Sequence, residues 1–210
     1  MNSWIKTIED DLNWREAELA SLKKLVIEAQ KPSVRYTTLL RAMCALLYAH
    51  YEGFCKFLWD YYLDVLEKQK IKRVECNSQL TKLSLQKDFK TLKGDLSLNS
   101  IWDFCNKRFS ELLEHDINFE MKLETQNNLW PNVLTDNLTC LGLDYSVVTN
   151  NETKLKNLVS RRNNIAHGQK MIIKDLDEYQ KYEDAVFNVI YELAFQIEGA
   201  ISRKQYLKNV

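Results

Sequence analysis

Hydrophobic residues recur at helical spacing along most of this chain. From residue 4 to residue 29, apolar side chains return every three or four positions, a period of about 3.6 that predicts a long amphipathic helix. Pro32 ends this helix, because the residue before a proline is pushed out of the α region. A second and more apolar stripe over residues 39–65 predicts a central helix, which the charged segment 67–75 closes.

The C-terminal third carries the same period together with start and stop signals. A short helix is predicted to begin at Pro131, since proline is favoured at the first helical position. Another helix is predicted to end at Gly168, and a long one to run from Asp175 to about residue 207. Asp175 is a good N-cap, and Glu178 stands three residues further on, which fits a capping box.

The segment between these two parts is less regular. Short apolar pairs alternate with lysines after residue 76, and residues 100–119 have the pattern of an amphipathic helix. With 5 glycines and 2 prolines in 210 residues, the chain has too few turn residues for an all-β fold. We therefore predict a single all-α domain over residues 1–210, a helical bundle with a peripheral insertion at about 70–128.

Composition and charge exclude several classes of protein. The chain is 45% hydrophobic and 28% charged, which rules out a disordered protein. Its 29 basic residues balance 29 acidic ones, which argues against a general nucleic-acid coat. No apolar run approaches the ~18 residues that cross a bilayer, and the acidic start does not resemble a signal peptide. A cytoplasmic protein without membrane contact is therefore expected.

The cysteines and histidines give no sign of a metal site. The five cysteines are odd in number and scattered, so we expect reduced thiols without a disulfide, several of them packed as small apolar side chains. They do not cluster with the three histidines at the spacing of a zinc site, and no glycine-rich phosphate loop occurs. Neither a metal nor another cofactor is expected.

One polar cluster, RRNNIAHG at residues 161–168, carries candidate chemistry. It places two guanidiniums, two amides and an imidazole on the last turns of one helix. Asn163 and His167 are four residues apart and share a face, while Arg162 lies about 140° around the helix from His167. An imidazole exchanges protons near neutral pH, and a guanidinium binds phosphate in bidentate fashion. Arg162, Asn163 and His167 could therefore flank one pocket for phosphodiester chemistry.

The spacing R-x4-H is weak evidence when taken alone. An exposed arginine followed by a histidine at the negative end of the helix dipole would show the same pattern without catalysis. Residues 152–170 hold five basic side chains and one acidic, a net charge of +4. Within this segment Lys154 and Arg161 are seven residues apart on one face, as candidate substrate-binding cations. Such a basic surface suits RNA, and equally an acidic protein partner.

The polar cluster resembles the R-x4-6-H signature of the HEPN superfamily, including the polar residue after the arginine. The segment YAHYEGFCKFLWDYYL, residues 48–63, is also similar to an early-helix segment with a central Glu-Gly-Phe in stand-alone bacterial HEPN proteins of the MAE and RiboL-PSP types. Those families occur in toxin–antitoxin and phage-defence loci. The resemblance covers the early helix and the chain from about Pro131 onward, and it implies a HEPN-like helical bundle.

The resemblance also implies an activity. It implies a metal-independent endoribonuclease that acts as a homodimer, in which two motifs form one composite site. By position, Arg162 and His167 would be the signature pair and Asn163 the supporting polar residue. His167 would be general acid or base while the RNA 2′-hydroxyl attacks its own phosphate, which Arg162 would hold. An antitoxin or defence-system protein is the expected partner. Toxins silenced by nucleotidylation carry a tyrosine where this chain has Gln169, which argues against that route.

Two polar residues of the early helix, His50 and Glu52, have separate predicted roles. His50 falls on the apolar stripe, which predicts a core histidine. Glu52 could face the motif helix and hold an arginine in position, or it could face solvent; the family segment favours the positioning role.

Two other functions fit the same pattern. A non-catalytic HEPN-fold module could bind RNA, a nucleotide or a partner protein, and an unrelated helical scaffold could carry the motif by chance. The complete set of Arg162, Asn163 and His167 favours the nuclease, because a binding module has no need of an acid/base residue.

Overall fold

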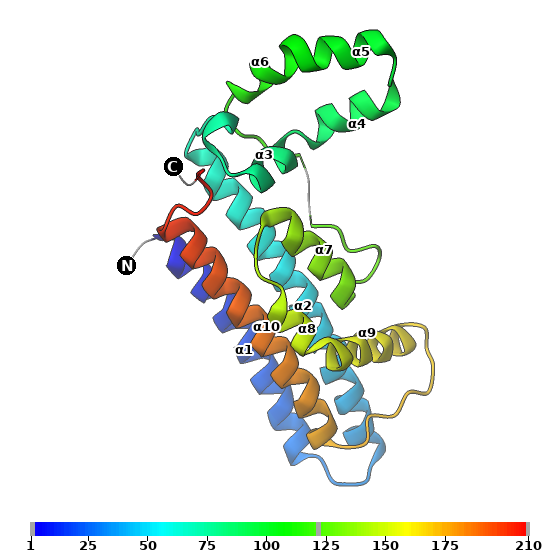
Figure 1. Ribbon diagram of the computed structural model, residues 1–210. Helices are drawn as coiled ribbons and strands as arrows, with labels where there is room; N and C mark the ends of the chain where they lie inside the picture. The colour runs from blue at the N-terminus through cyan, green and yellow to red at the C-terminus, as the bar shows by residue number, and fades with distance from the viewer. Residues whose placement is uncertain (1–2, 121–122, 209–210) are drawn as a thin grey trace.

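Three long helices lie side by side in the computed structural model, which describes residues 3–120 and 123–208 (Figure 1). They are α1 (Ser3–Glu28), α2 (Val34–Lys68) and α10 (Leu176–Ser202). α2 packs against both of the others and buries apolar or aromatic side chains along its whole length. The described residues form helices and loops without a strand, so the all-α prediction is confirmed.

Capping residues explain where two of the long helices begin. The Ser33 side chain accepts a hydrogen bond from the Tyr36 N–H at 3.1 Å, so α2 starts five residues before the apolar stripe does. Asp175 caps α10 through the Glu178 N–H at 2.9 Å. The predicted capping box is only half formed, because the Glu178 carboxylate accepts from the Lys174 N–H at 2.8 Å and not from that of Asp175. α10 also ends at Ser202, short of the predicted residue 207.

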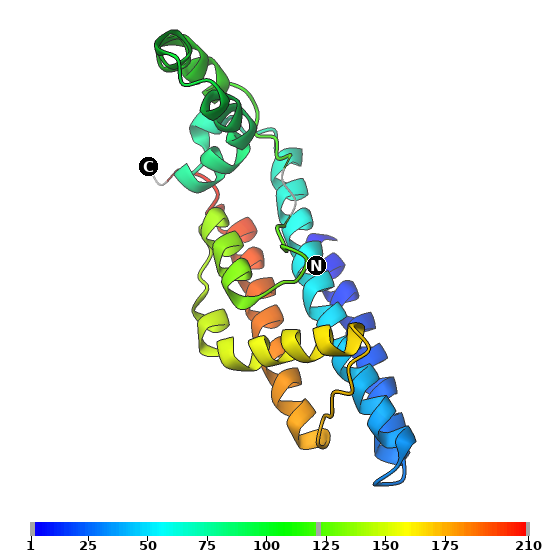
Figure 2. The same cartoon turned by 90° about the vertical axis from the view of Figure 1, so that its right-hand side faces the viewer.

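Three shorter helices cover one side of the long ones. In Figure 2, α9 runs across the bundle, over α10 and towards α2. Leu155, Leu158 and Val159 are buried on its inner face and fix this position. The covering helices are α7 (Pro131–Leu141), α8 (Ser146–Asn150) and α9 (Glu152–Ala166). Pro131 opens α7 as predicted, and Gly142, with φ of 72°, ends it.

An arm projects beyond the end of α2 that lies far from α9 (Figure 1). It rises from the short helices η1 and α3 and consists of α4 and the run of helix from α5 to α6, in which η2 is a π-helical turn. The bounds are η1 (Arg73–Glu75), α3 (Ser78–Ser84), α4 (Gln86–Gly94), α5 (Leu98–Asp103), η2 (Phe104–Arg108) and α6 (Phe109–Leu113).

The arm has a very small core of its own. Phe104 is its only buried side chain among residues 86–113, and its ring lies 5.9 Å from that of Phe89 and 5.8 Å from that of Phe109. At the base, the buried Arg73 donates to the Ser84 hydroxyl at 3.1 Å and to the Leu112 carbonyl at 3.0 Å. These contacts tie the arm to the end of the bundle.

All five cysteines are free thiols. Cys44, Cys55 and Cys76 are buried, whereas Cys105 and Cys140 are exposed. Burial raises the pKa of the Cys44 and Cys55 thiols to about 12 each. Across residues 3–120 and 123–208, no helix has the length and apolar character needed to cross a membrane.

Candidate functional site

The polar cluster forms the end of α9, where that helix meets α2 (Figure 2). Arg161, Arg162 and Asn163 belong to its last turns, and His167 is the residue that follows the final helical one. The His167 backbone N–H donates to the Asn163 carbonyl at 2.9 Å, and Gly168, with φ of +71°, ends the helix in the left-handed region.

Arg162 is held from three directions. Its Nη1 donates to the Asn128 side-chain oxygen at 2.8 Å and to the Asn163 side-chain oxygen at 2.9 Å. Its guanidinium carbon lies 4.2 Å from the centre of the Tyr48 ring, a cation–π contact from α2. Its Nε and Nη2 donate to none of the described residues. This edge of the guanidinium can therefore bind two oxygens of a phosphate.

His167 has the opposite character, since its side chain is exposed and makes no hydrogen bond or ion pair with any described residue. Asn163 lies one turn earlier on the same face of the helix, and Asn163 also contacts Arg162. Asn163 therefore contacts Arg162 through its side chain and His167 only through its backbone carbonyl, and no contact with the described residues fixes the imidazole relative to the guanidinium.

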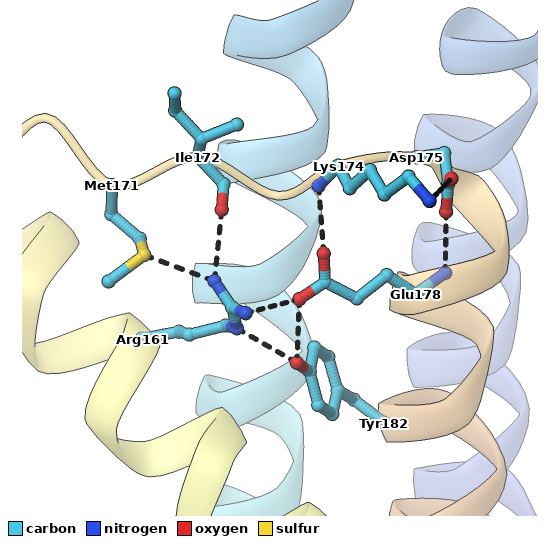
Figure 3. A network of polar contacts seen from close by, with 7 residues as sticks. All are labelled: Arg161, Met171, Ile172, Lys174, Asp175, Glu178 and Tyr182. Carbon is cyan, nitrogen blue, oxygen red and sulfur yellow. Dashed lines mark hydrogen bonds and ion pairs between the residues drawn. The ribbon is translucent and has the colours of Figure 1, made fainter.

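Arg161, although adjacent to Arg162, serves another part of the molecule (Figure 3). Its Nε donates to the Tyr182 hydroxyl at 2.8 Å, its Nη1 to the Ile172 carbonyl at 2.9 Å, and its Nη2 forms an ion pair with Glu178. Nη1 also lies 3.1 Å from the sulfur of Met171. These partners belong to α10 and to the loop before it, so Arg161 ties the motif helix to the next element.

The loop after the motif is held from α2 as well. Arg41 donates through Nη1 to the Gln169 carbonyl at 3.0 Å and to the Met171 carbonyl at 2.7 Å. Arg41 and Arg161 thus fasten the segment that follows His167 from two sides. Lys154 stands apart from this arrangement. It is exposed, lies about 10 Å before Arg161 along α9, and has no ion pair among the described residues.

Glu52 reaches the site through a tyrosine. The Tyr48 hydroxyl donates to one Glu52 oxygen, and Lys56 donates to the other at 2.6 Å. Burial by itself would raise the pKa of Glu52, but the hydrogen bonds from Lys56 and Tyr48 and the positive charge of Arg162 lower it below its ordinary value. The carboxylate is therefore ionised at neutral pH. No direct ion pair joins Glu52 and Arg162 among the described residues; Tyr48 lies between them and contacts both, and their opposite charges attract each other across it.

His50 faces away from the motif, towards α1. It is 4% exposed, packs edge-on against Trp14, and has its Nε2 2.9 Å from a Glu18 oxygen. Burial lowers the pKa of His50, against the effect of Glu18. The prediction of a core histidine is confirmed. The buried Arg15 also explains why residue 53 is a glycine, because a Cβ at Gly53 would lie 2.9 Å from Nη1 of Arg15.

Two contributors to the site, Tyr48 and Asn128, were not predicted from the sequence. Tyr48 lies four residues before Glu52, a spacing that places both on one face of α2 and could have indicated it. Asn128 comes from the irregular segment between the arm and α7, where no periodic pattern marks any residue.

The described residues contain no group of three or more His, Cys, Asp or Glu side chains placed to hold a metal ion. The site consists instead of a cation, amides, an imidazole and a carboxylate linked to the cation by an aromatic ring.

Comparison with known families defines the class of protein. The chain matches the HEPN_MAE_28990-like HEPN family over residues 4–206, a range that includes the arm. Because the match covers nearly the whole chain, the protein belongs to the HEPN superfamily. Within it, the protein is of the MAE type, as the motif at residues 161–168 and the segment at residues 48–63 had indicated. No curated protein and no solved structure matches the chain.

Proposed function

We propose that this HEPN protein is a metal-independent endoribonuclease, a toxin or phage-defence effector that cleaves RNA through its R-x4-H motif. The family points to a nuclease or another RNA-related function. The observation that favours cleavage is that the Arg162 guanidinium is fixed in position and keeps one edge unused. Its guanidinium is held by Asn128, Asn163 and Tyr48, while its Nε–Nη2 edge is unused by the described residues. A preorganised cation of this kind suits the charge that develops on a phosphate during the reaction.

The reaction would proceed by attack of the RNA 2′-hydroxyl on the adjacent phosphorus. A base removes the proton of that hydroxyl, the new P–O2′ bond forms, and the P–O5′ bond breaks as an acid protonates the departing 5′-oxygen. The products are a 2′,3′-cyclic phosphate and a 5′-hydroxyl. His167 would transfer protons, Arg162 would bind the non-bridging oxygens, and Asn163 would support Arg162.

This reaction calls for both a base and an acid, and one chain supplies one motif histidine. We therefore propose a homodimer in which two motifs face a common cleft and His167 of each copy takes one role. RNA is the proposed substrate, and an antitoxin or another defence-system protein the proposed regulator, in the cytoplasm.

Cleavage of a labelled single-stranded RNA in excess EDTA tests the proposal. We expect products with 2′,3′-cyclic phosphate and 5′-hydroxyl ends, and no cleavage of DNA of the same sequence, because DNA lacks the 2′-hydroxyl. His167→Ala should reduce the rate by about 10²–10⁴-fold, the usual contribution of general acid–base catalysis. Asn157→Ala, at an exposed and uncharged position of the same helix, is the matched control.

Two results would contradict this function. One is folded His167→Ala protein that cleaves at the wild-type rate, with circular dichroism to establish that it is folded. The other is RNA binding without cleavage by the wild-type protein, which would favour a non-catalytic HEPN module. Light scattering tests the dimer: a fully active monomer at micromolar concentration would refute the composite site.

A further inference from the structure

We propose that Tyr48 is a positioning residue for Arg162, which sets the direction of the guanidinium without touching the substrate. This inference rests on the proposed function, because it assigns Arg162 the task of binding the scissile phosphate. Tyr48 is on α2 and Arg162 on α9, so the contact between them fixes one side of the candidate site relative to the core of the bundle.

The first argument is the rigidity of the tyrosine. Tyr48 is 1% exposed, and the guanidinium carbon of Arg162 is 4.2 Å from its ring centre. Both functions of the Tyr48 hydroxyl are used: it donates to Glu52 and accepts from the Leu129 N–H at 2.8 Å. A buried ring with its far end bonded on two sides cannot turn, so it provides a fixed surface on which a flexible arginine side chain is held flat.

The second argument is electrostatic. The ionised Glu52 accepts a hydrogen bond from the Tyr48 hydroxyl, which shifts electron density towards the Tyr48 ring and strengthens the attraction of the ring face for a cation. Burial, the bond to Glu52 and the Glu52 charge raise the pKa of Tyr48, so the phenol keeps its proton and remains a donor at any physiological pH. A carboxylate, a phenol and a guanidinium therefore follow one another from α2 to α9.

The third argument concerns the loop before α7. The Tyr48 hydroxyl accepts a hydrogen bond from the backbone N–H of Leu129. The preceding residue, Asn128, accepts a hydrogen bond from Arg162 through its side-chain oxygen. Tyr48 thus holds Arg162 directly through its ring and also places the loop that supplies another partner of Arg162. One side chain of α2 organises two of the three contacts that orient this arginine.

Kinetics of RNA cleavage in variants test the assignment. Tyr48→Phe keeps the ring and loses both hydrogen bonds, and should lower kcat by about fivefold. Tyr48→Leu also loses the cation–π contact and should lower kcat by about 10- to 100-fold, with KM changed much less. The matched controls are Tyr36→Phe and Tyr36→Leu. Tyr36 is also buried on the same helix, its hydroxyl has no partner among the described residues, and it lies more than three helical turns from Tyr48, so these changes should leave kcat within about twofold.

A double-mutant cycle separates positioning from a general structural effect. In protein that already carries Arg162→Ala, Tyr48→Leu should change kcat by less than about twofold, because there is no guanidinium left to position. An equal loss with and without Arg162 would overturn the proposal. So would an equal loss in Tyr36→Leu, which would show that any cavity in α2 has this effect.

Nuclear magnetic resonance of the arginine side chain gives a readout that does not depend on activity. The Nε–H signal of Arg162, assigned from its loss in Arg162→Lys, should be shifted by the Tyr48 ring current in the wild type. It should move towards the position of a free arginine in Tyr48→Leu and stay in place in Tyr36→Leu. An unchanged signal in Tyr48→Leu would overturn the positioning role. If the wild type cleaves no RNA, the proposed function fails, and this measurement still decides the role of Tyr48.

Discussion

The end of α9 and the arm both carry charged side chains, but they are built differently. At the end of α9, Arg162 takes partners from α2, from its own helix and from the loop before α7. In the arm, the charged pairs join exposed side chains, such as Lys107 and Glu111 at 3.9 Å, or Lys87 and Glu120 at 2.8 Å. Exposed pairs of this kind contribute little to stability and do not orient a side chain.

Apolar side chains show the same contrast. Leu98 is 87% exposed and Trp102 69% exposed in α5, whereas Leu155 in α9 is fully buried. The site is therefore supported by the core of the bundle, while the arm rests on one buried phenylalanine and its base. Catalytic groups need a fixed geometry, because small displacements cost large factors in rate. The difference supports the proposal that the chemistry takes place at α9 and not in the arm.

The largest effect is expected at Arg162. Arg162→Ala should lower kcat for RNA cleavage by about 10²–10³-fold through loss of transition-state stabilisation. Arg162→Lys should recover only part of this, because an ammonium group lacks the two parallel donors of the guanidinium edge. Steady-state kinetics with matched circular dichroism spectra measure both. Full activity of Arg162→Lys would show that charge alone matters and that the edge does not.

A moderate effect is expected at Arg161, and it should fall on stability. Arg161→Met removes the cation that pairs with Glu178 and the donor to the Ile172 carbonyl, and should lower the free energy of unfolding by about 1–3 kcal/mol. Chemical denaturation measures this, with the exposed Lys154→Ala as control at within about 0.5 kcal/mol. If Arg161→Met were as stable as the wild type but weaker in RNA binding, Arg161 would be a substrate contact after all.

The smallest effect is expected in the arm. The double change Leu98→Ser and Trp102→Ser should alter the free energy of unfolding by no more than about 0.5 kcal/mol and leave RNA cleavage unchanged. Leu155→Ala is the positive control, with an expected loss of about 2–5 kcal/mol for a buried leucine. A fall in cleavage by the arm variant would mean that the arm contributes to the site, and the contrast between the two regions would fail.

Much of the local structure followed from the sequence. The 3.6-residue period indicates the helices, and Pro32, Pro131, Asp175 and Gly168 mark one end each of α1, α7, α10 and α9, because backbone sterics and capping act over a few residues. The motif at residues 161–168 and the segment at residues 48–63 were sufficient to indicate the family, which the match over residues 4–206 established. The arm was less predictable, since its helices are short and bury almost no apolar surface.

Only the tertiary structure decided which way the polar residues of each helix face. Arg161 and Arg162 are adjacent, so helical geometry places them about 100° apart, but it does not say which one meets α10 and which one meets α2. His50 and Glu52 are two residues apart and face α1 and the motif respectively. Periodicity sets angles within a helix, whereas the neighbours are set by packing between segments far apart in the chain. Tyr48 and Asn128 join Arg162 for that reason alone.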